Sequence, residues 1–289
     1  MSDATTRAGE ERNAPPNVCC EGSSSAASAP LAAPIAEETS SEELRRLVRD
    51  KYGQLARESQ SCCGSGADQD LERLGYSRDQ SEILPEGANL GLGCGNPLAH
   101  AAIRVGETVL DLGSGAGIDV FLAAREVGPL GRALGVDMTH EMLERARENA
   151  RRAGIDNVEF RLGEIEHLPV ANDSVDLVIS NCVINLSPDK PQVFSEAYRV
   201  LKPGGRLVVS DLVLTRPLPA EVRESVEAYT GCIAGASLRD DYLRQIRAAG
   251  FRDVETVEER GYVATGAECC VPDPVAESVL SMKVRAWKR

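Results

Sequence analysis

Apolar runs and amphipathic segments alternate through the middle of the chain. The apolar runs show little polar alternation, which is typical of parallel strands that are covered on both faces. They lie at 108–113, 133–137, 158–162, 175–181 and 206–211. The segments between them repeat apolar residues at helical spacing and predict helices at 118–127, 139–153 and 189–201. This alternation predicts an α/β fold, a doubly wound, Rossmann-like domain with a mostly parallel sheet.

Capping residues indicate where these helices begin and end. Thr139 is the expected N-cap of the second helix, and Gly154 is its expected end. In the third helix we expect Ser187 as the cap, Pro188 at the first helical position and a Pro-Gly-Gly terminator at 203–205.

The regions around this core differ in composition and divide the chain into four parts. Residues 1–40 are rich in Ser, Ala and Pro and predict a disordered tail. Residues 41–98 form an N-terminal helical and Gly/Cys-rich segment, whose first helix is capped by Ser41. Residues 99–215 are the core, and residues 216–289 are a C-terminal α+β extension. The extension has predicted helices at 219–229 and 238–249, and predicted strands at 254–259 and 278–287 that close the sheet, the last one antiparallel.

Charge and hydropathy exclude several classes of partner. The chain of 289 residues can bury a full α/β core, but its net charge is −13 and its pI is near 4.9. A nucleic-acid partner requires clustered Lys and Arg, so we expect none. No apolar run is long enough for a membrane-spanning helix, and residues 1–16 contain no apolar signal core. We therefore expect a cytoplasmic protein.

The nine cysteines are unusual for such a protein. In a reducing cytosol they should be thiols. Burial as small apolar residues suits the three single cysteines, but it suits the adjacent pairs poorly, because those pairs lie among Ser, Gly and Glu. The single cysteines are Cys94, Cys182 and Cys232, and the pairs are Cys19-Cys20, Cys62-Cys63 and Cys269-Cys270. The chain has no C-x-x-C pair and only three histidines, which argues against a structural zinc site of the usual spacing.

A glycine loop follows the first predicted strand and opens the first predicted helix. Gly113, Gly115 and Gly117 form G-x-G-x-G, whereas a dinucleotide fingerprint is G-x-G-x-x-G or A with an acidic residue about 20 positions later. S-adenosylmethionine is the alternative ligand, and it needs room for a methionyl group rather than a phosphate cradle. Asp111, just before the glycines, suits the α-ammonium and sulfonium of that ligand.

The ends of the later strands supply further groups for S-adenosylmethionine, because ligands of such sheets bind at the carboxyl ends of the strands. Asp137 can accept hydrogen bonds from both ribose hydroxyls, and Met138 can cover a purine face. Glu164 can accept from an adenine amino group. Taken singly, Asp137 could be a helix cap and Glu164 a solvated side chain, but together with Asn181 they favour the methyl donor.

Three thiols from three segments can converge near the end of the fourth strand. Cys182 follows that strand and could be inert, be methylated itself, or hold the acceptor; Cys94 and Cys232 come from outside the core. Soft thiolates select thiophilic ions, and a trivalent metalloid keeps a lone pair that can attack a methyl sulfonium. Thiolate binding releases protons, so such capture should weaken at low pH.

Four runs resemble the motifs of arsenite S-adenosylmethionine methyltransferases, over about residues 45 to 250. They are NCVINLSPDK at 181–190, GLGCGNP at 91–97, GCIAGA at 231–236, and YG at 52–53 followed by SCCG at 61–64. The resemblance implies a class I methyltransferase that methylates trivalent arsenic held by Cys182 and Cys232. It implies that Cys94 is a third catalytic thiol, which forms a disulfide with Cys182 when arsenic is oxidised, and that Cys62 or Cys63 matches a further family cysteine. The expected cofactor-binding residues are Asp111, Gly113, Ser114, Gly115, Asp137, Met138, Glu164, Ile165 and Asn181.

The expected setting is arsenic detoxification by a cytoplasmic monomer. Its partners would be arsenite, methylarsenite and a thiol reductant such as thioredoxin or glutathione, with no metal cofactor. Two other functions share parts of this pattern. Methylation of a small organic acceptor such as a quinone would use the same fold but give the three thiols no common role. A thiol-rich metalloid-binding protein without turnover would not need an intact methyl-donor site.

Overall fold

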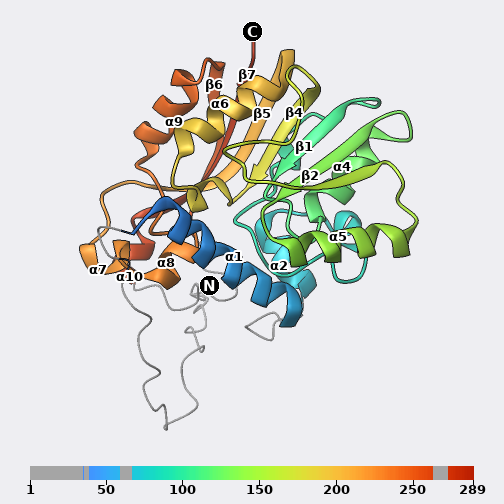
Figure 1. Cartoon of the computed structure of the whole chain (residues 1–289). Helices are drawn as coiled ribbons and strands as arrows, with labels where there is room; N and C mark the ends of the chain where they lie inside the picture. Colours follow the sequence, from blue (N-terminus) through green and yellow to red (C-terminus); the bar gives the residue numbers. More distant parts are fainter. Residues whose placement is uncertain (1–34, 36–38, 59–66, 263–272) are drawn as a thin grey trace, which may run out of the picture. The chain divides into compact units, whose positions relative to one another are not determined.

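A seven-stranded mixed sheet forms the centre of the computed structural model, which describes residues 35, 39–58, 67–262 and 273–289 (Figure 1). The strand order is β3-β2-β1-β4-β5-β7-β6. The first five strands are parallel, and β7 runs antiparallel between β5 and β6. The strands are β1 (Thr108–Leu112), β2 (Arg132–Asp137), β3 (Val158–Leu162), β4 (Val175–Asn181), β5 (Leu201–Leu214), β6 (Arg252–Gly261) and β7 (Val279–Trp287).

Helices cover both faces of the sheet because most strands are apolar on both sides. Val109 and Leu110, adjacent on β1, belong to two different cores. One core holds α4 (Ile118–Val127) and α5 (His140–Ala153), and the other holds α6 (Lys190–Val200) and α9 (Arg239–Ala248). The predicted α/β fold with a doubly wound, mostly parallel sheet and an antiparallel last strand is therefore confirmed.

The N-terminal helix lies at the carboxyl ends of the parallel strands. Helix α1 (Ser41–Glu58) lies along this edge of the sheet and contacts α5 and α8 (Figure 1). The remaining elements are α2 (Ala67–Leu74), α3 (Arg78–Glu82), η1 (Leu98–His100), η2 (Ile184–Leu186), α7 (Ala220–Arg223), α8 (Val226–Thr230) and α10 (Asp273–Ala276). The described residues belong to one compact unit, and none of their helices is long and apolar enough to span a membrane.

Two of the predicted helix caps are wrong. Ser40, not Ser41, caps α1, because its hydroxyl accepts from the Glu43 amide and the Glu43 carboxylate accepts from the Ser40 amide. Asp189 caps α6 by accepting from the Gln192 amide, whereas the Ser187 hydroxyl donates to a buried Glu166.

The predicted helix at 219–229 is two short helices, because the Ser225 side chain accepts from the Ala228 amide and caps α8. The Pro-Gly-Gly segment at 203–205 does not simply terminate a helix. It lies in an irregularity within β5, which already pairs with β4 at Leu201 and resumes regular pairing at Arg206. The predicted disordered tail falls almost entirely outside the described residues.

Candidate functional site

The glycine loop joins β1 to α4 and is tied to the end of β2. The amides of Gly113 and Ser114 both donate to the Val136 carbonyl, at 2.8 and 3.0 Å. Gly113 has φ +67°, and a Cβ there would lie 2.3 Å from Cγ2 of Val183. A side chain at this position would therefore collide with the segment that follows β4, which explains why the loop needs glycine here.

Asp137 closes the far side of this loop. One carboxylate oxygen accepts from the Gly115 amide at 2.9 Å, and the other accepts from the Thr139 amide at 2.8 Å. Burial raises the pKa of Asp137, although these backbone hydrogen bonds oppose the increase. The carboxylate is thus held in one orientation, and each oxygen keeps a lone pair that a ligand hydroxyl could use.

Three buried carboxylates surround the loop without a neighbouring cation on the described chain. Burial, and then repulsion by Asp119 and Asp137, holds the pKa of Asp111 well above its ordinary value, and no described residue donates a hydrogen bond to it. Burial raises the pKa of Asp119 to about 6. A positively charged ligand would relieve this repulsion, so the site favours a cation. Asp119 was missed in the sequence because an acid in the first turn of a helix usually only stabilises the helix N-terminus.

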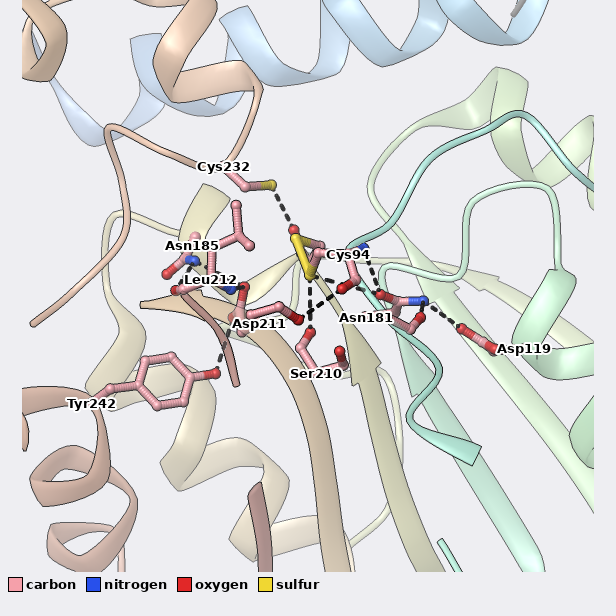
Figure 2. The surroundings of a disulfide bond; sticks show 12 residues. Cys94, Asp119, Asn181, Asn185, Ser210, Asp211, Leu212, Cys232 and Tyr242 are labelled. Carbon is pink, nitrogen blue, oxygen red and sulfur yellow. Dashed lines mark hydrogen bonds between the residues drawn. A yellow bond between two sulfur atoms is a disulfide. The ribbon is translucent and has the colours of Figure 1, made fainter. Parts of the chain in front are cut away.

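Asn181 connects Asp119 to the loop that carries Cys94 (Figure 2). Its amide nitrogen lies 3.2 Å from Oδ2 of Asp119 and 2.7 Å from the Gly95 carbonyl oxygen. Its amide oxygen accepts from the Cys94 backbone N–H at 3.1 Å. Tyr76, which the sequence analysis did not single out, donates to Asp119 at 2.8 Å. One side chain at the end of β4 therefore contacts both halves of the site.

The residues expected beside the adenine lie in different environments. Ile165 is buried in a core cluster, and Met138 is half-buried against the cluster that contains Cys182 and Cys232. The Glu164 carboxylate forms ion pairs with Arg45 at 3.4 Å and Arg49 at 3.8 Å, both on α1. The two arginines give no signal in the sequence, because only the fold brings α1 to this strand end.

The three single cysteines meet beyond the end of β4. Cys94 and Cys182 form a disulfide with a Cα–Cα distance of 5.6 Å, and the Cys232 thiol donates to the Cys182 carbonyl at 2.7 Å (Figure 2). The observed pairing is the one that the family resemblance implies. Cys182 and Cys232 have φ values of +58° and +67°, which are unusual for residues with a side chain. Such strain is typical of functional positions, where the surrounding structure imposes the conformation.

Neighbouring strands fix the positions of these cysteines. The Cys182 amide donates to the Ser210 carbonyl on β5 at 2.8 Å, and the Ser281 hydroxyl on β7 donates to the Cys94 carbonyl at 2.8 Å. Reduction of the disulfide would leave three thiols on three separately anchored segments. The three thiols could then act together as soft ligands.

A buried carboxylate, Asp211, lies next to the disulfide and was also missed in the sequence. One of its oxygens and the sulfur atoms of Cys94 and Cys182 lie within 4.8 Å of one another. Burial raises the pKa of Asp211 to about 7, and hydrogen bonding from Tyr242 and the charge of Lys190 oppose this shift. The sequence pattern predicts only that this acid ends the fifth strand. Its proximity to the thiols depends on how the strands pair in the fold.

The paired cysteines fall outside the described part of the chain. This holds for Cys62 and Cys63, which were candidates for a further thiol, and for Cys19, Cys20, Cys269 and Cys270. Their relation to the site stays a prediction.

Comparisons with known proteins give one consistent group of relatives. A family model described as a methyltransferase domain matches residues 103–250. An arsenite methyltransferase of Halobacterium salinarum is 53% identical over 229 residues, which cover 74% of this chain and 59% of the relative. The solved structure of an arsenic(III) S-adenosylmethionine methyltransferase from Chlamydomonas reinhardtii is 39% identical, with a TM-score of 0.61 and coverage of 76% of this chain and 73% of that chain.

A more distant relative carries the chemistry of the rival hypothesis. The demethylmenaquinone methyltransferase of Lactococcus lactis is 33% identical over 168 residues, which cover 55% of this chain and 67% of the relative. The chain spans only about three fifths of the length of the Halobacterium relative.

Proposed function

Because this chain belongs to the arsenite methyltransferases within the class I methyltransferase family, we propose that it transfers methyl groups from S-adenosylmethionine to trivalent arsenic bound by cysteine thiolates. The observation that carries the proposal is the convergence of Cys94, Cys182 and Cys232 beside a loop lined by buried carboxylates. A quinone-type acceptor would give the three thiols no role.

The methyl donor binds across the carboxyl ends of β1, β2 and β4 in this proposal. S-adenosylmethionine, when bound, supplies the electrophilic methyl carbon of its sulfonium. Asp111 accepts the α-ammonium, Asp137 accepts the ribose hydroxyls, and Gly113, Ser114 and Gly115 leave room for the methionyl group. Glu164 accepts a hydrogen bond from the adenine amino group. Met138, Ile165 and Asn181 make the remaining contacts with the methyl donor. The buried carboxylates support this assignment, because their raised pKa values indicate that a cation would be stabilised there.

Arsenic binds after a thiol reductant has opened the Cys94–Cys182 disulfide. The thiols of Cys182 and Cys232, and then that of Cys94 as the third ligand, each replace one hydroxide of arsenite, and each displaced hydroxide leaves as water with the thiol proton. The lone pair of arsenic then forms the bond to the methyl carbon while the bond between that carbon and the sulfonium sulfur breaks, and S-adenosylhomocysteine leaves with the electron pair of the broken bond, so no general base is needed. Methylation oxidises arsenic by two electrons. The sulfur atoms of Cys94 and Cys182 then bond to each other as their bonds to arsenic break, and arsenic keeps one electron pair and returns to the trivalent state.

We extend the proposal to the setting of the reaction. The enzyme would act in the cytoplasm as a monomer, in arsenic detoxification, with thioredoxin or glutathione as the reductant and no metal cofactor. Residues 99–215 would hold the methyl donor, and residues 41–98 and 216–289 would contribute to the arsenic side of the site.

One assay tests the proposal. Purified protein is mixed with S-adenosylmethionine, arsenite and a thiol, and methylated arsenicals are separated by chromatography with element-specific detection. Cys182→Ser and Cys232→Ser should each abolish turnover while S-adenosylmethionine affinity stays near the parental value. If no methylarsenical forms although the methyl donor binds, the activity is wrong; if either variant methylates arsenite at the parental rate, the thiol site is misplaced.

A further inference from the structure

Two sulfur atoms and one carboxylate oxygen form a donor set that methyl transfer does not use as a unit. Sγ of Cys94, Sγ of Cys182 and an oxygen of Asp211 lie within 4.8 Å of one another (Figure 2). Cys94 lies in the loop before η1, Cys182 follows the last residue of β4, and Asp211 lies in the carboxyl-terminal part of β5. No C-x-x-C spacing is involved, so motif rules do not detect this site.

Asp211 is oriented as metal-binding carboxylates are. The residue is 1% exposed, and one carboxylate oxygen accepts from the Asn185 side chain at 2.9 Å and from the Leu212 amide at 3.1 Å. The other oxygen accepts from the Tyr242 hydroxyl at 3.0 Å. Such outer partners hold a ligand in place and typically change metal affinity by about 10–100-fold when removed.

We propose that the reduced protein binds a zinc-class divalent cation through Cys94, Cys182 and Asp211. Zn²⁺ accepts thiolate and carboxylate ligands together, and water takes the fourth position. A dithiol reductant must first transfer two electrons and two protons to the disulfide, becoming a disulfide itself. Binding of Zn²⁺ to the two thiols then releases two protons to solvent.

Reduction of the disulfide is needed before the three ligand atoms can take the distances of a zinc site. Tetrahedral Zn²⁺ with Zn–S bonds of about 2.3 Å and a Zn–O bond of about 2.1 Å places its ligand atoms about 3.6–3.8 Å apart. Reduction lets the two sulfur atoms separate to about this distance, and the carboxylate is already within 4.8 Å of both. The cation would also neutralise a buried negative charge.

This cation would block the arsenic site, an inference that rests on the proposed function because Cys94 and Cys182 serve both sites. The two ligands differ in their third partner, since arsenic uses the Cys232 thiol and zinc uses the Asp211 carboxylate. A substitution of Asp211 should therefore weaken only zinc binding, and a substitution of Cys232 should weaken only arsenite binding.

The test measures Zn²⁺ and arsenite affinities separately, without methyl donor. We use the full-length chain with Cys19, Cys20, Cys62, Cys63, Cys269 and Cys270 replaced by Ser, reduced under anaerobic conditions. Zn²⁺ is titrated in competition with a chromophoric chelator. Asp211→Asn should weaken Zn²⁺ binding about 100-fold and Tyr242→Phe about tenfold, while arsenite affinity stays near the parental value. Cys232→Ser should do the reverse, losing arsenite and keeping Zn²⁺.

The oxidised parent serves as the negative control and should not bind Zn²⁺ at this site. S-adenosylmethionine affinity and the unfolding transition verify that each variant is folded. Parental Zn²⁺ affinity in Asp211→Asn would overturn the proposal, as would equal binding by the oxidised protein. Loss of Zn²⁺ in Cys232→Ser together with its retention in Asp211→Asn would assign the cation to the thiols alone. None of these results depends on methyl transfer, so failure of that activity is recognised separately.

Discussion

Gly235 controls the position of Cys232 by its lack of a side chain. A Cβ on Gly235 would lie 2.0 Å from the carbonyl oxygen of Asn185, about 1.4 Å short of an ordinary contact, which begins at 3.4 Å. Asn185 is fully buried, and its amide nitrogen binds Asp211 at 2.9 Å and the Leu212 carbonyl at 2.7 Å. The turn around Gly235 must therefore move, and Cys232 lies three residues away in the same turn.

We expect Gly235→Ala to abolish high-affinity arsenite binding while S-adenosylmethionine affinity stays within about twofold. Bonds from arsenic to sulfur do not tolerate displacements of about 1 Å, and overpacking of this kind costs about 1–3 kcal/mol of stability. Arsenite binding to the reduced protein is measured by calorimetry, and unfolding by denaturant. Gly261→Ala is the matched control, because a Cβ there meets nothing within 4 Å and the residue lies in β6, outside the turn that carries Cys232. Parental arsenite affinity in Gly235→Ala would refute the reasoning.

Three further predictions concern charged groups. Burial raises the pKa of Asp119 to about 6, and only the ionised carboxylate attracts a cation. The affinity for S-adenosylmethionine should therefore fall about tenfold from pH 7 to pH 5 in the parent and change less in Asp119→Asn. A parental affinity that does not change with pH would contradict this prediction. Arg45→Met removes the ion pair of the buried Glu166, at 3.5 Å, and should lower the free energy of unfolding in denaturant by about 1–3 kcal/mol. Arg49 is 39% exposed, so Arg49→Met should lower it by less than about 1 kcal/mol. Equal losses in the two variants would argue against a stabilising Arg45–Glu166 pair. Burial raises the pKa of Asp211 from 3.8 to about 7, so the folded state binds a proton that the unfolded state has lost, and this contribution to stability disappears as pH rises through that interval. In the oxidised protein Asp211→Asn should thus be roughly 2–4 kcal/mol more stable than the parent at pH 8 and about equal at pH 4, and a pH-independent difference would be inconsistent with a raised pKa.

The sheet could be predicted because its strands are apolar and its helices have clear ends. β3 and β4 have the predicted bounds, and Gly154 ends α5 in the left-handed conformation as expected. The errors arose where a local alternative competed. Ser40 and Asp189 each lie one or two residues from the predicted caps, and all four candidates have side chains that can cap a helix.

Some residues of the candidate site could be predicted from the sequence and others could not. Groups at strand ends could be located because parallel strands bring their carboxyl ends together, and Asp111, Asp137 and Cys182 do lie there. Asp119, Asp211 and Arg45 could not, because their proximity depends on side-chain direction and on the path of α1 across the sheet edge. An acid in a helix, an acid in a strand and a base on an amphipathic helix carry no such information in the sequence.

Arsenic X-ray absorption of the reduced protein loaded with one equivalent of arsenite identifies the atoms bound to arsenic. In the chain whose six paired cysteines are serine, the account predicts three sulfur neighbours around arsenic, supplied by Cys94, Cys182 and Cys232. The number should fall in both Cys182→Ser and Cys232→Ser, with oxygen taking the vacated position. An unchanged coordination shell in either variant, or an oxygen-only shell in the parent, would contradict the account.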